Sequence, residues 1–188
     1  EGGGIVILDG AMGTELERVG APMDHDLWCA IATEDHPGLV SRVHRSYLDA
    51  GADVITANTF SSGRYALEDA GVAEKVAGWN ERSVELAIAA RDQWSTRPVC
   101  IAGSVSVYGL YQKTRPAEEL KRGFREHADI LIDAGVDLII LELLGATDAQ
   151  ALSAIESLAD VDVPVWVSLS CRVEPNGAVM HGSEESPG

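Results

Sequence analysis

Apolar runs of four to eight residues, rich in valine and isoleucine, alternate along this chain with longer segments whose apolar residues recur at helical spacing. The runs span residues 5–8, 52–56, 99–102, 136–141 and 163–169, and the longer segments lie at about 37–50, 76–94, 116–134 and 147–158. Nearly continuous apolar runs are typical of strands that are buried on both faces of a parallel sheet. The alternation therefore predicts a parallel α/β fold, because parallel neighbours need a crossover helix.

The chain also contains two segments of similar sequence. Residues 47–55 (YLDAGADVI) resemble residues 131–139 (LIDAGVDLI), and each stretch indicates a helix end, a glycine turn and a strand. A complete (β/α)₈ TIM-type barrel needs roughly 250 residues, whereas this chain has 188. One domain over residues 1–188, an incomplete TIM-type barrel with about five βα units, fits the pattern. An open α/β sheet fits it too, and residues 176–188 are expected to form a loop.

The net charge of −16, spread along the chain, argues against nucleic acid and anionic membranes as partners. No apolar run approaches the roughly 20 residues that cross a bilayer, and the first residues lack the basic region of a signal peptide. Three widely spaced cysteines do not make a disulfide framework. We therefore expect a cytoplasmic protein with small-molecule partners, and homo-oligomerisation is left open.

Polar residues follow the apolar runs at the points where strands are expected to end. They are Asp9 and Gly10, then Thr56, Asn58 and Thr59, then Ser104 and Tyr108, and finally Glu142. Ligands bind at the carboxyl ends of parallel strands in both candidate architectures, so these residues are predicted to share one rim. The set suits a small ligand that carries an ammonium and a carboxylate group. Acids bind the ammonium, and backbone N–H groups near Gly10 can approach the carboxylate.

Each of these residues also has a structural interpretation. Asp9 can cap the turn that follows the first run. Glu142 stands within the apolar stretch IILELL, where a carboxylate is unfavourable without a partner, and that partner is either a ligand or a structural salt bridge. Asn58 and Thr59 are common in turns, and Tyr108 can simply pack.

Metal ligands are not evident in the pattern. The five histidines show no ligand spacing, and no metal-binding residue is predicted in this chain. Cys29 and Cys100 are expected to be small packing residues. Cys171 stands at the expected end of a strand, without a spaced cysteine or histidine partner.

Taken together, the rim segments resemble the homocysteine S-methyltransferase family. The similar segments are residues 8–16 (LDGAMGTEL), 50–60 (AGADVITANTF), 102–105 (AGSV), 134–142 (AGVDLIILE) and 165–168 (VWVS). They follow the order of the family and extend over nearly the whole chain.

The resemblance implies a (β/α)₈ barrel enzyme that transfers a methyl group from a sulfonium, ammonium or other donor to the thiol of homocysteine, giving methionine. It implies that Asp9 and Glu142 bind the amino group of homocysteine and that Gly10 contacts the substrate through its backbone. The loop containing Thr56, Asn58 and Thr59 is implied to line the pocket.

Two departures from the family pattern limit what the resemblance implies. Ser106-Val107 replaces a Gly-Pro pair before Tyr108, so the methyl donor is left open. Zinc is expected in the complete family domain. The family's zinc cysteines lie further along the sequence than Cys171, in part as Gly-Gly-Cys-Cys, and they are not in this chain.

The implied chemistry is the activation of a thiol. A free thiol has a pKa of about 8.5 and is a poor nucleophile at neutral pH, whereas coordination to zinc removes its proton. An alternative is a non-catalytic domain that binds a thiol or an amino acid without zinc, and whether this chain alone is active is left open. An unrelated open α/β enzyme would need a nucleotide fingerprint such as Gly-x-Gly-x-x-Gly, which the sequence lacks.

Overall fold

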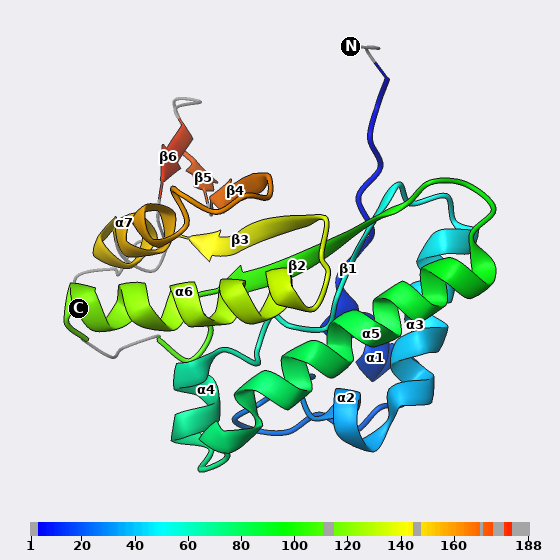
Figure 1. The fold of residues 1–188 in the computed structure, drawn as a ribbon, viewed down its shortest axis with the longest axis horizontal. Coiled ribbons are helices and arrows are strands. Elements are labelled where there is room, and N and C mark those ends of the chain that lie inside the picture. The colour runs from blue at the N-terminus through cyan, green and yellow to red at the C-terminus, as the bar shows by residue number, and fades with distance from the viewer. Residues whose placement is uncertain (1–3, 111–114, 145–147, 170, 175–178, 182–188) are drawn as a thin grey trace.

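The computed structural model describes residues 4–110, 115–144, 148–169, 171–174 and 179–181. Its main sheet has four parallel strands in chain order, β1 (Val54–Thr56), β2 (Cys100–Ser106), β3 (Leu138–Leu144) and β4 (Val165–Leu169) (Figure 1). Helices separate successive strands in the chain, as parallel pairing requires. The predicted parallel α/β fold is confirmed.

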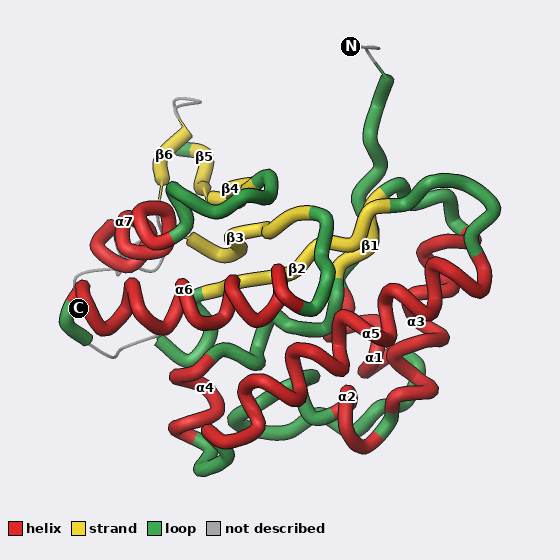
Figure 2. Tube along the Cα trace, in the orientation of Figure 1, coloured by secondary structure: helices red, strands yellow, loops and turns green. Residues whose placement is uncertain are grey.

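Helices gather on one side of the sheet (Figure 2). They are α1 (Met12–Arg18), α2 (Ala32–Asp35), α3 (Pro37–Asp49), α4 (Arg64–Asp69), the 3₁₀ turn η1 (Ala73–Lys75), α5 (Val76–Trp94), α6 (Ala117–Asp133) and α7 (Asp148–Ser157). The four longest helices, α3, α5, α6 and α7, correspond to the four predicted ones. Thr147, expected to cap the last helix, lies outside the described residues.

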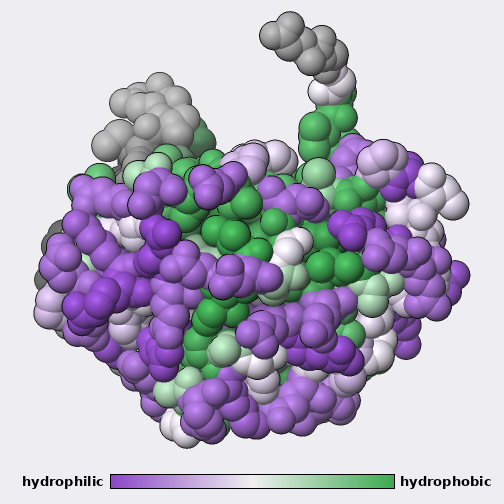
Figure 3. Space-filling model, viewed as in Figure 1, coloured by the Kyte–Doolittle hydropathy of each residue, from purple (hydrophilic) through white to green (hydrophobic). Residues whose placement is uncertain are grey.

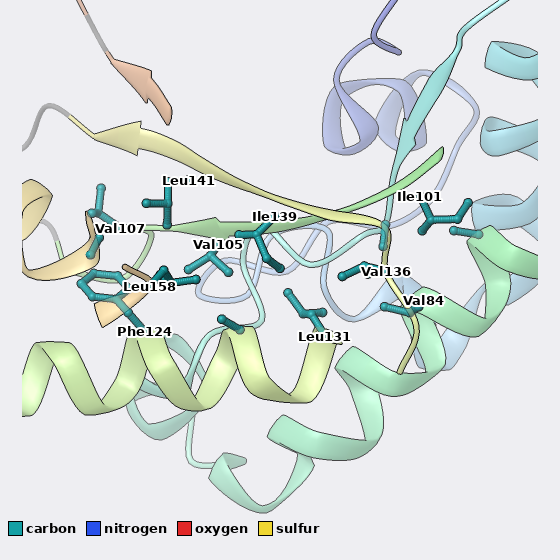
Figure 4. Close-up of a cluster of buried hydrophobic side chains, with 14 of the residues drawn as sticks. Val84, Ile101, Val105, Val107, Phe124, Leu131, Val136, Ile139, Leu141 and Leu158 are labelled. Atoms are coloured by element: carbon teal, nitrogen blue, oxygen red, sulfur yellow. The ribbon is translucent and has the colours of Figure 1, made fainter. Parts of the chain in front are cut away.

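The main core lies between this helical layer and the sheet (Figure 4). Ile101 and Ile139 from the strands meet Val84 of α5 and Leu131 of α6, and all four are buried. Alternate strand residues face the other side, where Val54, Ala102, Leu138 and Ile140 form a second cluster. This two-sided burial explains why the strands read as continuous apolar runs.

The two similar segments, residues 47–55 and 131–139, form the same local structure in the fold. Gly51 and Gly135 adopt left-handed backbones, with φ of 97° and 101°, where each preceding helix ends. Each is followed two residues later by an aspartate that accepts a hydrogen bond from a neighbouring extended segment. Asp53 accepts from the Ile7 N–H at 2.9 Å, and Asp137 accepts from the Ile101 N–H at 2.7 Å.

Residues 5–8 depart from the expectation of a buried strand. They lie parallel to β1 through a single bridge between Leu8 and Val54, and the Ile7 carbonyl accepts from two backbone N–H groups. Ile5 is 86% exposed and Leu8 is 43% exposed, because no described segment pairs with their outer side. Figure 3 shows apolar surface along this segment. β4 is also partly exposed, as at Trp166.

Two further expectations are corrected at the periphery. β5 (Cys171–Val173) pairs antiparallel with β6 (Val179–His181), so part of the stretch expected to be loop forms a strand. Cys100 begins β2 and is exposed, whereas Cys29 is buried as expected. Within the described part of the chain, no helix is both long and apolar enough to cross a membrane.

We expect Asp137→Ala to lower the free energy of unfolding by about 1–2 kcal/mol, because the N–H of buried Ile101 loses its charged acceptor. Urea denaturation measures the change. The matched control is Asp162→Ala at an exposed position of the loop before β4, with an expected change within about 0.5 kcal/mol. Equal effects of the two substitutions would contradict the role given to Asp137.

Candidate functional site

A cavity of about 280 Å³ opens where β1 and β3 end. Its lining comprises Leu8, Asp9, Gly10, Ala11, Met12, Gly13, Trp28, Cys29, Thr56, Ala57, Asn58, Phe60, Ser104 and Glu142. Six of the eight predicted site residues are in this set, and Asp9 and Glu142 share the cavity although they lie far apart in the sequence. Among the residues that the structure describes, no Lys, Arg or His lines the cavity, so no described cationic side chain neutralises the two acids there.

Asp9 is fixed by β1. Its carboxylate accepts a hydrogen bond from the Thr56 N–H at 2.7 Å and another from the Thr56 hydroxyl at 2.8 Å. Burial outweighs these bonds and raises the pKa of Asp9 from 3.8 to about 6. Without a ligand, the site therefore holds a carboxylate whose charge is poorly compensated.

Glu142 is placed in the cavity by the alternation of β3. Burial raises its pKa, the Ser104 hydroxyl opposes that rise, and the negative charge of Asp9 adds to it. The described residues of the lining include no cationic side chain that would form a structural salt bridge with Glu142. Two partly buried acids that repel each other favour a cationic ligand between them.

The loop after β1 is held by its own polar side chains. The Asn58 amide donates to the Cys29 carbonyl at 2.8 Å and to the Thr33 hydroxyl at 3.1 Å. The Thr59 hydroxyl donates to the Ser104 carbonyl at 2.8 Å and accepts from the Ser104 N–H at 2.9 Å. Thr59 is fully buried and outside the lining, so it joins the loop to β2.

A buried polar cluster fixes the far end of this loop. Asn80, in the second turn of α5, donates to the carbonyls of Ser62 and Val76 at 2.9 and 2.8 Å. Its Oδ1 accepts from the Ser62 hydroxyl at 2.6 Å and lies 2.9 Å from Nε2 of His127. No local sequence pattern identifies Ser62, Asn80 and His127 as a cluster. The available signal was an asparagine on the apolar face of a helix.

Aromatic rings form one wall of the site. The ring centroids of Trp28 and Phe60 are 5.7 Å apart, and Tyr108 stacks on Trp28 at 6.4 Å with an interplanar angle of 21°. Tyr108 therefore lies behind Trp28 and does not belong to the lining. Trp28 was not predicted as a site residue from the sequence, because its position depends on contacts with distant segments.

Gly10, in the loop after residues 5–8, and Gly13, in the first turn of α1, allow the chain to approach α3 and the Trp28 ring closely. A Cβ at Gly10 would lie 2.8 Å from the Tyr47 hydroxyl, and one at Gly13 would lie 2.6 Å from the Trp28 ring. The Tyr47 hydroxyl also donates to the Ala11 carbonyl at 3.0 Å. Larger residues at either glycine would move the loop that carries Asp9.

Metal binding does not fit the described residues. Among them, no group of three or more His, Cys, Asp or Glu side chains is arranged to hold a metal ion. Cys29 lines the cavity, but burial raises the pKa of its thiol to about 11, so it stays protonated. Cys171 is an exposed residue of β5. The cavity is better suited to an ammonium group than to zinc.

A larger groove of about 1080 Å³ lies between α4, α6 and α7 and is a poorer candidate. Its charged side chains pair with one another, as in Arg64 with Glu126 and Arg125 with Asp160. Such pairs form a solvated surface, and they leave little free charge to bind a ligand.

Comparison with known proteins shows which family this chain is similar to. The family model for homocysteine S-methyltransferase matches residues 6–186. Homocysteine S-methyltransferase 2 of Arabidopsis thaliana is 30% identical, over 90% of this chain and 60% of its own length. Selenocysteine Se-methyltransferase of Brassica oleracea var. italica is 30% identical, over 92% of this chain and 57% of its own length.

Among solved structures, the metallated form of the homocysteine methyltransferase MmuM from Escherichia coli superposes with a TM-score of 0.79 at 28% identity. The match covers 89% of this chain and 64% of that chain. It confirms the TIM-type class of the fold, with β1 to β4 as consecutive strands. The chain thus spans about 60% of the length of these relatives.

We expect Asp9→Asn to stabilise the ligand-free protein. The unfolded chain releases this proton near pH 3.8 and the folded chain near pH 6, so ionisation of Asp9 destabilises the fold as pH rises between these values. Two pKa units correspond to roughly 3 kcal/mol, and weaker bonding to Thr56 offsets about 1 kcal/mol. The variant should therefore be about 1–2 kcal/mol more stable at pH 7.5.

Urea denaturation between pH 4 and 8 measures the effect, with Asp35→Asn, an exposed acid of α2, as the matched control. A variant of Asp9 that is less stable than the wild type at pH 7.5 would show that its charge is compensated by the fold.

Proposed function

The chain belongs to the homocysteine S-methyltransferase family, and on that premise we propose that the protein transfers a methyl group to the thiol of homocysteine, giving methionine. The observation that carries the proposal is the pair Asp9 and Glu142, two carboxylates with raised pKa values in one cavity. The donor is a sulfonium, an ammonium or another activated methyl compound.

The acid pair suits the amino group of an amino acid. An ammonium between Asp9 and Glu142 would neutralise one of the two negative charges and relieve their mutual repulsion, and its N–H groups would donate charge-assisted hydrogen bonds to both carboxylates. Gly10 has no side chain to keep a carboxylate from the backbone N–H groups of its loop. The selenocysteine Se-methyltransferase among the relatives is named for an acceptor with the same ammonium and carboxylate groups.

The aromatic wall suits the methyl donor. A sulfonium or quaternary ammonium is a cation without N–H groups, and such cations are bound favourably by aromatic faces. Trp28 and Phe60 line the cavity with the acids, so a thiol held by its amino group and a donor held by the rings would lie side by side. Fixing both partners in this way favours an in-line attack on the methyl carbon.

The roles assigned to the described residues are binding and orientation. Zinc, which the family resemblance implies, finds no ligand set among them, and no step is assigned to it. Asp9 and Glu142 stay ionised around the ammonium and transfer no proton in this scheme. Thr56 orients Asp9 through two hydrogen bonds, and Asn58 and Thr59 hold the loop.

The rival function is a non-catalytic domain that binds a thiol or an amino acid. It would use the same acids, but would turn over no methyl donor, and membership of a methyltransferase family favours the enzyme. The full protein loaded with zinc should form methionine from homocysteine with at least one sulfonium or ammonium donor. Absence of turnover with all common donors, together with retained homocysteine binding, would favour the rival.

We further propose a reducing, cytoplasmic setting, supported by three free cysteines.

We expect Glu142→Gln to weaken homocysteine binding by at least about tenfold, because a charge-assisted bond to the ammonium is lost. Calorimetry measures the affinity for L-homocysteine and for 4-mercaptobutyrate, which has the thiol and carboxylate without the amino group. The analogue should bind weakly to both proteins, and the substitution should not weaken it further. An equal loss for both ligands would place the amino group elsewhere. Glu156→Gln, an exposed acid of α7, is the control.

Homocysteine affinity should also depend on pH. The pKa of Asp9 is about 6 in the empty site, and only the ionised form binds the ammonium. At pH 5 about a tenth of Asp9 is ionised, so the dissociation constant should rise about tenfold relative to pH 7.5. Titrations at the two pH values measure this ratio. A ratio that persists in Asp9→Asn would assign the pH dependence to another group.

A further inference from the structure

Trp28 has an unusual backbone. Its φ is +48°, and it is the one non-glycine residue with positive φ in the part of the chain that the structure describes. A bulky residue rarely adopts this left-handed conformation, because its Cβ crowds the backbone. Such a conformation persists only where the surroundings impose it, and these outliers cluster at ligand sites. Trp28 lines the cavity, so the cause of its conformation bears on the site.

The cause lies four residues earlier, at Asp24. The Asp24 N–H donates to the Trp28 carbonyl at 3.0 Å, and the Trp28 N–H donates to the Asp24 carbonyl at 3.1 Å, which closes a tight loop. Inside the loop, the Asp24 carboxylate accepts from the N–H groups of Asp26 and Leu27, both at 2.8 Å. These two bonds hold the pKa of Asp24 below its usual value, so it is ionised at neutral pH.

The loop is also anchored to the protein on its inner side. Leu27 is buried, and its carbonyl accepts from the Ser61 hydroxyl at 2.8 Å. Cys29 is buried directly after the loop, and its carbonyl accepts from Asn58. With both neighbours fixed, the left-handed turn at Trp28 directs its ring against Gly13, with Tyr108 stacked on it.

We propose that Asp24 is a positioning residue for the methyl-transfer reaction: by closing the loop of residues 24–28 it holds the Trp28 ring in the cavity wall, and so sets the affinity for the cationic methyl donor. Asp24 does not belong to the cavity lining and acts only through Trp28. The inference rests on the proposed function, because it assigns the donor to the aromatic wall. A change at Asp24 should therefore alter the affinity for the methyl donor and leave the affinity for homocysteine unchanged, since homocysteine is bound by Asp9 and Glu142.

The test compares Asp24→Ala with Asp24→Asn. Alanine removes the acceptor of the two loop N–H groups, whereas the side-chain oxygen of asparagine keeps it, so asparagine should rescue the function. Asp26→Ala is the matched control, because Asp26 is an exposed acid of the same loop whose carboxylate pairs with the His25 ring at 2.8 Å and accepts neither of the two loop N–H bonds. Asp24→Ser, with a shorter acceptor, serves if the alanine variant fails to fold.

Steady-state kinetics of the zinc-loaded full protein, with S-methyl-L-methionine as the sulfonium probe and glycine betaine in parallel, give KM for donor and for homocysteine. We expect Asp24→Ala to raise KM for the donor roughly tenfold, while KM for homocysteine changes less than about twofold. Asp24→Asn and Asp26→Ala should match the wild type. Near-ultraviolet circular dichroism of the same proteins should lose the signal of the stacked Trp28 and Tyr108 rings only in Asp24→Ala.

An unchanged donor KM, or an equal rise of both KM values, would overturn the role of Asp24. If the wild-type enzyme turned over neither donor, the proposed function would be in question. The circular dichroism would then still decide the structural step: a wild-type spectrum in folded Asp24→Ala would show that Asp24 does not position Trp28.

Discussion

Two carboxylates held partly out of water in one cavity are the constraint on which this site depends. The negative charge of each raises the free energy of the other, and the described residues of the lining include no cationic side chain to relieve it. The fold tolerates Asp9 because Thr56 donates two hydrogen bonds to it, whereas burial and the charge of Asp9 both disfavour an ionised Glu142. Such an arrangement is unfavourable in the empty protein and favourable around an ammonium ion, which is the property expected of a binding site.

The rest of the local structure serves to hold these acids and the facing rings in place. Loop 56–63 is fixed at one end by Asn58 and Thr59 and at the other by the buried cluster of Ser62, Asn80 and His127. Because burial lowers the pKa of His127 to about 4, its ring is neutral at physiological pH and suits an uncharged amide partner. These hydrogen bonds hold the loop against the helices that it contacts, which preorganises the site.

The two outer segments of the sheet contrast with this ordered centre. Residues 5–8 and β4 carry large apolar side chains that are 40–86% exposed, including Ile5 and Trp166. Asp9, which lines the cavity, nevertheless follows directly after the first segment. Two hydrogen bonds join this part of the chain to the region of β1: the Ile7 N–H donates to the Asp53 carboxylate, and the Thr56 N–H donates to the Asp9 carboxylate. Site geometry therefore depends on hydrogen bonds across this edge more than on burial of the segment.

The sequence by itself determined the elements and the rim. Apolar periodicity located four strands and four long helices, the repeated Ala-Gly-x-Asp marked two equivalent turns, and the strand ends predicted that Asp9 and Glu142 would meet, because parallel strands share one carboxyl edge. Only the tertiary structure decided the roles of Thr59, Tyr108 and Trp28. Thr59 bonds to backbone, Tyr108 stands behind Trp28, and Trp28 enters the cavity through a left-handed turn. These outcomes depend on contacts between distant segments and on one backbone angle that no local pattern encodes.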